Sequence, residues 1–180
     1  MKLQHRVTVV PGNATLDGKT VSSSGIPQLY REFAGDYPKF FKMDSLCRLG
    51  FVAAEILLKD IPAEILENAS IILFNRNGSL ITDRNYQATI LPDNYFPSPA
   101  LFVYTLANIV TGEIAIRHKI YGESSMYVID DFDPAVIERI ASESLLTSSP
   151  SIIIAGWVDF NSDSDYVADL RIYSPEDFES

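Results

Sequence analysis

Two almost uninterrupted apolar runs, residues 70–74 and 151–158, constrain the fold of this chain more than any other feature. Each has the length of a β-strand, and the second contains three consecutive isoleucines from Ile152. A strand that is covered on one face alternates apolar and polar residues, whereas a strand covered on both faces reads as continuous apolar sequence. Turn residues follow the first run at 75–78. The pattern therefore predicts a sheet with helices on both faces, as in α/β proteins.

Helical periodicity alternates with these strands. Asp44 stands at the start of one helical pattern, and Asp133 with Pro134 gives another a capping residue and a first-turn proline. The expected strands are residues 5–10, 70–74, 124–129, 151–158 and 166–173, and the expected helices are 43–59, 99–119 and 133–145. This order, strand–helix three times and then two strands, predicts an α/β fold with a mostly parallel five-stranded sheet. Alternation over 166–173 predicts one antiparallel edge strand, and residues 11–30 are expected to be irregular, with room for a small hairpin.

Composition limits the function classes. The 180 residues are 47% hydrophobic, which fits a single domain over 1–180, and 14 basic against 24 acidic residues give a net charge of −10. An acidic chain without a basic patch is not expected to bind nucleic acid or an acidic membrane surface. One cysteine, Cys47, excludes an internal disulfide and fits a cytoplasmic protein. No run reaches membrane-helix length, none at the N-terminus has the form of a signal peptide, and no cofactor is predicted.

The run from Pro97 to Gly122 is predicted to form one long helix, entered through prolines and left through a glycine. Its first half is apolar almost all round, so we expect it to be buried, and its charged second half should face solvent. This run resembles the helix that precedes the nucleophile strand of the β-ketoacyl-acyl carrier protein synthases. The further matches, in the family's order, are 40–57, 76–83 and 155–159. The resemblance implies a single thiolase-like half-domain, the N-terminal one of the two that ketosynthases contain.

The resemblance also implies where a catalytic cysteine would stand, at the junction between the third strand and its helix. There a helix N-terminus lowers the thiol pKa. This chain has Asp130 and Asp131 at that junction and no cysteine, and it has no second half-domain to supply the family's two histidines. We therefore predict no catalytic residue and no condensation by this chain alone.

The family's dimer arrangement implies a partner surface along the third strand and the preceding helix. The interface candidates are Asn108, Thr111, Gly112, Ser125, Met126, Tyr127, Val128 and Ile129, and the candidates for an acyl pocket are Phe96, Phe102 and Tyr104. A homodimer, or a heterodimer with a ketosynthase-like subunit, is the expected assembly. Acyl carrier proteins are acidic, so their docking on this acidic chain alone is doubtful.

Other residue patterns have structural explanations that we favour. Cys47 lies among apolar residues of a helix and is expected to be an inert buried thiol, and His5 and His118 are expected to be ordinary surface histidines. Asp130, Asp131 and Asp133 fit helix capping better than an acid/base or metal cluster. The alternating residues from Asp159 to Asp165 resemble half a calcium loop but lack its glycine and closing glutamate, so a hairpin turn is preferred and no metal site is predicted.

Three functions remain open at this point. The favoured one is a catalytically degenerate ketosynthase-like protein that serves as a structural or accessory partner in fatty-acid or polyketide-type synthesis, for example of an aryl-polyene-like product. In the second, the chain is a subunit of a heteromeric 3-oxoacyl-acyl carrier protein synthase whose partner supplies cysteine and histidine. The third, ranked lowest, is an independent enzyme that uses Asp130 to Asp133, with or without a metal.

Overall fold

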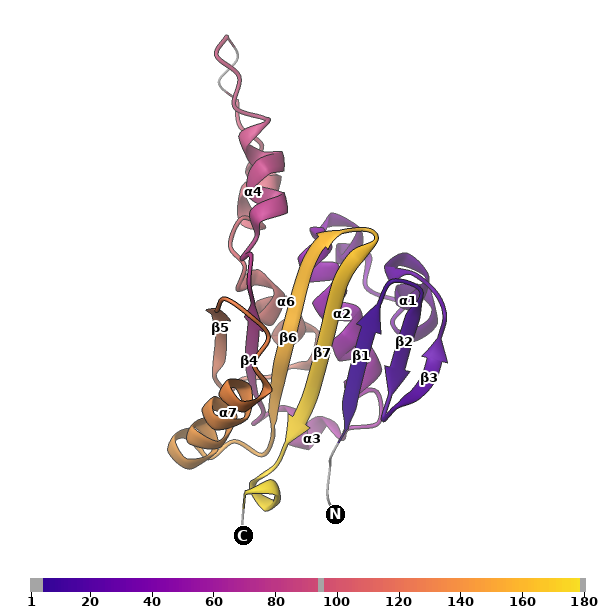
Figure 1. Cartoon of the computed structure of the whole chain (residues 1–180), viewed down its shortest axis with the longest axis vertical. Helices are drawn as coiled ribbons and strands as arrows, with labels where there is room; N and C mark the ends of the chain where they lie inside the picture. The colour runs from indigo at the N-terminus through magenta and orange to yellow at the C-terminus, as the bar shows by residue number, and fades with distance from the viewer. Residues whose placement is uncertain (1–4, 94–95, 179–180) are drawn as a thin grey trace.

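The computed structural model describes residues 5–93 and 96–178 and shows one seven-stranded sheet with helices on both faces (Figure 1). The strands are β1 (Arg6–Val10), β2 (Asn13–Leu16), β3 (Lys19–Ser22), β4 (Ser70–Asn75), β5 (Ser124–Val128), β6 (Ile153–Ser162) and β7 (Asp165–Tyr173). The helices are α1 (Ile26–Phe33), α2 (Ser45–Leu58), α3 (Ala63–Leu66), α4 (Leu80–Gln87), α5 (Pro99–Val103), α6 (Ile109–His118) and α7 (Pro134–Ser148), with 3₁₀ turns at Pro38–Lys42 and Pro175–Asp177.

The sheet has the strand order β3-β2-β1-β7-β6-β4-β5. Only β4 with β5 and β4 with β6 run parallel, and the other four neighbouring pairs are antiparallel. The predicted mostly parallel, five-stranded sheet was therefore wrong in strand number and in direction. The continuous apolar runs did mark the two central strands, since all six residues of β4 and the first eight of β6 are buried.

The predicted edge strand, β7, lies in the interior of the sheet. β1 pairs with it antiparallel, with Val7 opposite Leu170, so β7 is hydrogen-bonded on both sides. The edges are instead β3 and β5. The segment expected to be irregular supplies the β2–β3 hairpin and α1, and the positive φ of Asp17 and Gly18 forms the hairpin turn.

Two apolar clusters lie on the two faces of the sheet. The larger one packs α1, α2 and α6 against the sheet, and α2 is buried along almost its whole length. The smaller one packs α7 on β4 and β6, through Ile137, Ala141, Phe74 and Trp157. Figure 1 shows α7 on the near side of the sheet, with α1, α2 and α6 behind it. Among the described residues, no helix is long and apolar enough to span a bilayer.

The predicted long helix at 99–119 is two helices, α5 and α6, and its burial is the reverse of the prediction. No residue of α5 is buried, whereas Val110, Thr111, Glu113 and Ile114 of α6 are. A hydrogen bond from a distant residue lies at the break: the Ser79 hydroxyl donates to the Thr105 carbonyl, and the helix restarts at Ile109. A carbonyl held by a side chain in this way is less available to continue a helical ladder.

Candidate functional site

The junction after β5 is the position where the family resemblance would place a nucleophile. β5 lies parallel to β4, and the Ile129 N–H donates to the Asn75 carbonyl at 2.9 Å, which ends the pairing. Asp133 then caps α7: its Oδ1 accepts hydrogen bonds from the N–H groups of Ala135 (2.9 Å) and Val136 (3.3 Å). The predicted cap is confirmed, and the carboxylate occupies the first donors of the helix.

The other acidic residues of this junction point outward. Asp131 is exposed and contacts the exposed Arg76 at 3.3 Å, a pair that solvent screens strongly. Phe132 remains exposed but packs edge-on against Trp157, with ring centroids 5.8 Å apart. The junction is thus filled by a cap and an aromatic contact. Within residues 5–93 and 96–178, no three His, Cys, Asp or Glu side chains are arranged to hold a metal ion.

The single thiol and the two histidines do not lie at the junction after β5. Cys47 is buried at 2% exposure in α2, as predicted, and burial raises the pKa of its thiol well above the ordinary value. His5 contacts Asp17 at 2.8 Å. His118, expected at the surface, is mostly buried beside Glu55, with Nε2 3.0 Å from Oε1. No cysteine–histidine pair is therefore formed among these residues.

β5 forms an open edge of the sheet. Residues of a strand direct their backbone groups alternately to its two sides, and Glu123 and Ile129 bond to β4. The N–H and C=O groups of Met126 and Val128 therefore point away from the sheet, toward the side where the described chain places no further strand. The side chain of Val128 is 59% exposed. Such an edge is a template for pairing with another strand.

A protruding arm adjoins this edge. We call α4 and α5, with residues 88–93 and 96–98 between them, the arm; Figure 1 shows α4 extending away from the sheet. Its base is tied to α2, because the Thr82 hydroxyl donates to Asp44 Oδ2 at 2.6 Å. A hollow of about 570 Å³ lies between the arm base and β5, and its lining includes Leu106, Asn108 and Met126.

The acyl-pocket candidates are not brought together. Phe96 is 84% exposed and Phe102 is 53% exposed on the arm, where Phe102 contacts the Tyr86 ring at 5.5 Å. Tyr104 is 7% exposed and belongs to the larger core cluster, and burial raises its pKa to about 12. In the single chain these three side chains form no common cavity.

The interface candidates differ in accessibility. Tyr127 and Val128 are exposed, whereas Ser125, Met126, Ile129 and Gly112 are partly buried. Thr111 is 3% exposed, and its hydroxyl donates to the Asn108 carbonyl at 2.8 Å. Thr111 therefore belongs to the packed interior of α6, and its side chain is not on the accessible surface.

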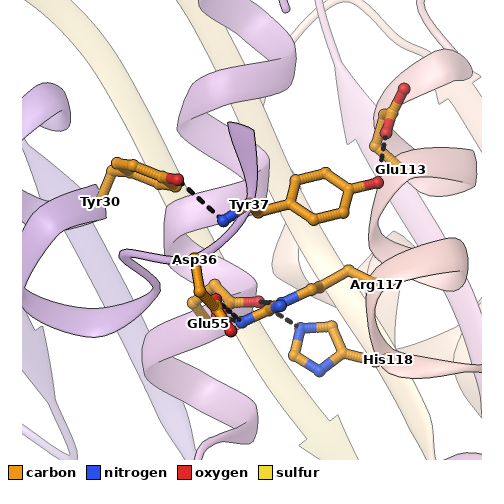
Figure 2. A network of polar contacts seen from close by, with 7 residues as sticks. All are labelled: Tyr30, Asp36, Tyr37, Glu55, Glu113, Arg117 and His118. Atoms are coloured by element: carbon orange, nitrogen blue, oxygen red, sulfur yellow. Dashed lines mark hydrogen bonds and ion pairs between the residues drawn. The ribbon is translucent and has the colours of Figure 1, made fainter. Parts of the chain in front are cut away.

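A buried polar network, which the sequence reading missed, fixes α6 against α2 (Figure 2). Arg117 holds Glu55 through two hydrogen bonds, at 2.9 and 3.1 Å, and reaches Asp36 at 2.8 Å. Burial raises the pKa of Glu55, but contacts with His118 and Arg117 outweigh it and leave that pKa below the ordinary value. The available signal was the group of charged residues Glu113, Arg117 and His118 in α6, for which the sequence predicts a solvent-facing position.

The second half of the network joins the Pro38–Lys42 turn to the same helix. Glu113 is buried and pairs with Lys39, and the Tyr37 hydroxyl donates to Glu113 Oε2 at 3.3 Å. The Tyr30 hydroxyl in turn accepts the Tyr37 N–H at 2.9 Å (Figure 2). The two glutamates, Glu55 and Glu113, are buried and paired with cations, whereas Lys39 and Asp36 reach solvent, so the network orients α6 and leaves no buried carboxylate free to act as an acid or base.

Comparisons with protein-family models and with curated protein sequences give no match. Solved structures do match. A ketosynthase in complex with its chain length factor from Xenorhabdus doucetiae has a TM-score of 0.64 at 12% identity, over 95% of this chain and 76% of the matched chain. The ishigamide ketosynthase/chain length factor gives 0.72 at 14%, over 98% and 62%. A type II polyketide acyl-carrier protein complex with its ketosynthase gives 0.58 at 13%, over 96% and 64%.

The chain has the thiolase-like fold of these proteins. It spans about three quarters of the first matched chain and less than two thirds of the other two. At 12–14% identity the likeness establishes the fold, and the chemistry has to be argued from the residues of this chain.

Proposed function

We propose that this chain is a non-catalytic, ketosynthase-like subunit that pairs through the β5 edge with a ketosynthase-type chain in fatty-acid or polyketide-type synthesis. The open edge of β5, next to a junction without a nucleophile, is the observation that carries this proposal. The matched ketosynthase from X. doucetiae is itself described in complex with a chain length factor, which supports the heteromeric arrangement.

The chemistry of the junction supports an accessory role. Acyl transfer by a ketosynthase needs a thiolate that forms a thioester, and a carboxylate at the same place cannot replace it. Asp133 is committed to the α7 cap, and the Cys47 thiol is buried in α2 with a raised pKa. The partner would therefore supply cysteine and histidine.

The surface around β5 supports association. Apolar side chains are exposed on β5, on the arm and just after α5: Leu91, Phe96, Phe102, Val103, Leu106, Tyr127 and Val128. Scattered apolar residues are common on protein surfaces, but apolar residues beside an unpaired strand are typical of an interface. A second strand on β5 would satisfy the outward backbone groups and cover part of this surface.

A co-purification experiment tests the proposal. The chain is co-expressed with a ketosynthase from the same genome, and the mass of the purified complex is measured by light scattering after size exclusion. Val128→Pro removes one outward N–H and leaves the bonds to β4 in place, so it should abolish the complex. Val128→Ala keeps the N–H and serves as the matched control, which should retain most of the complex.

The outcomes separate the assemblies. A 1:1 complex that is lost only in the proline variant supports the heterodimer. A mass of twice 20.0 kDa for the chain alone indicates a homodimer, and its loss in Val128→Pro would assign that dimer to the same edge. A chain that stays monomeric at high concentration, both alone and with the ketosynthase, contradicts the proposal. We further expect the chain alone to bind no acyl carrier protein at low salt, because both are acidic.

A further inference from the structure

The sheet face that carries α7 is only partly covered by that helix. α7 packs on β4 and β6, and the rest of the face is formed by β7 and β1. Because Val7 and Val9 face the larger core, the alternate residues of β1 lie on the α7 side. Arg6 comes from β1, and Asp169, Arg171 and Tyr173 come from β7. This part of the face is therefore polar and charged.

Arg6 forms an ion pair with Asp169, the carboxylate that β7 places beside it on the α7 side of the sheet. Its Nε donates to Asp169 Oδ1 at 2.8 Å, and its second terminal nitrogen contacts Asp169 Oδ2. This hydrogen bonding raises the pKa of Arg6, against the effect of burial. Asp169 itself is buried, so both of its oxygens are committed to this fork-like pair.

Arg171 forms no ion pair with residues 5–93 or 96–178. It stands directly opposite Arg6 in the β1–β7 register, and like charges opposite each other on neighbouring strands destabilise a sheet. Among the described residues, its guanidinium has no hydrogen bond and no ion pair, although the residue is partly buried. A partly buried guanidinium that faces a like charge and has no carboxylate of its own is suited to an anion from outside the chain.

Arg171 lines a hollow that has room for such a ligand. The hollow measures about 340 Å³, and we call it the α7–β7 hollow. The described residues that line it are His5, Arg6, Glu138, Arg171, Ile172, Tyr173, Asp177 and Phe178. The Asp177 carboxylate is already engaged, because it accepts hydrogen bonds from the N–H and the hydroxyl of Ser174. The Tyr173 and Phe178 rings stack with centroids 6.0 Å apart and form an aromatic wall. Glu138 of α7 also lines the hollow, and the ion pairs of the described residues include none between it and Arg171.

We propose that the α7–β7 hollow binds a small organic anion, with its carboxylate or phosphate group held by Arg171 and its apolar part on Tyr173 and Phe178. Guanidinium groups bind both oxyanions through two parallel hydrogen bonds, and the volume suits a molecule of modest size. Nothing in this site involves β5, so it is independent of the proposed pairing with a ketosynthase.

The test is a titration of the full chain with inorganic phosphate, acetate and benzoate, followed by calorimetry and by the shift in melting temperature. We expect saturable binding, tighter for benzoate than for acetate because of the aromatic wall. Arg171→Gln should weaken it at least about tenfold. Arg139→Gln, which removes an exposed α7 arginine that pairs only with Glu143, is the matched control and should leave it unchanged. Glu138→Gln should tighten binding, because it removes a like charge from the opposite wall.

A second measurement separates ligand binding from a role in folding. Without ligand, Arg171→Gln should melt at the same temperature as the natural chain or higher, because it removes the repulsion from Arg6. Binding of phosphate alone would assign a phosphorylated ligand, and binding of benzoate alone would assign an aromatic carboxylate; either supports the proposal if it depends on Arg171. No saturable binding of the three anions, binding that survives Arg171→Gln, or a lower ligand-free melting temperature of that variant would overturn it.

Discussion

Gly50 marks the closest approach between α2 and α6, and its replacement by alanine is the sharpest test of this packing. A Cβ at Gly50 would lie 2.4 Å from Val110 Cγ2 and 3.5 Å from Val158 Cγ1. The first distance is far inside van der Waals contact. Val110 is itself fully buried, so its side chain has little room to move aside. Gly50→Ala should therefore push α6 away from α2.

The magnitude follows from two opposing effects. Inserting a methyl group into a filled core lowers the free energy of unfolding by about 1–3 kcal/mol. Replacing glycine by alanine inside a helix raises it by about 1 kcal/mol. Gly50→Ala should thus lower the free energy of unfolding by up to about 2 kcal/mol. Gly112→Ala in α6 is the matched control, because its Cβ would meet nothing within 4 Å. That variant should gain up to about 1 kcal/mol.

Urea unfolding followed by circular dichroism measures both variants, and the difference between them isolates the clash. Val110→Ala should destabilise the natural chain by leaving a cavity, but in the Gly50→Ala background it should relieve the contact. The double variant should therefore be more stable than the sum of the two single changes predicts. If Gly50→Ala proves as stable as Gly112→Ala, or if Val110→Ala adds its full effect in both backgrounds, the packing argument is refuted.

Three further predictions concern charged and reactive residues. Ionised Glu55 has a lowered folded pKa, so it contributes stability above its ordinary pKa of 4.5, and this contribution is lost as pH falls through the folded pKa. Glu55→Gln should accordingly be less stable near neutral pH, with a deficit that shrinks in acid, as pH-dependent urea unfolding would show; a deficit independent of pH would contradict this. Asp133→Ala should lower the free energy of unfolding by about 1 kcal/mol through loss of the α7 cap. Asp131→Ala should change neither the free energy of unfolding nor partner binding, because its side chain is exposed. Equal losses of stability in the two variants, measured by urea unfolding, would contradict the assignment of the cap to Asp133. Cys47 should react with a thiol reagent only as the chain unfolds, and rapid labelling of the native protein would contradict its burial.

The sequence was most informative where a residue's role is local or depends only on burial. Continuous apolar runs identified β4 and β6, because both of their faces are covered whatever the strand order. Asp44 and Asp133 were read correctly as caps, since capping needs only the next three residues. The polar turn between β6 and β7 was also correct.

The errors arose where a distant segment decided the outcome. The alternation in β7 is the same for an edge strand and for an interior strand with one polar face, and only the pairing of β1 with β7 separates the two. The break between α5 and α6 depends on Ser79, far from Thr105 in the sequence. The burial of Arg117 and His118 depends on Glu55 of α2.

The sequence by itself therefore determined an α/β domain with two buried central strands, capped helices at Asp44 and Asp133, and a strand–helix junction without a thiol. Tertiary structure alone decided that β5 is an open edge of the described sheet, that α6 is held by paired charges, and that Arg171 stands directly opposite Arg6. The physical reason is that burial and capping depend on neighbours along the chain, whereas strand order and charge pairing depend on neighbours in space.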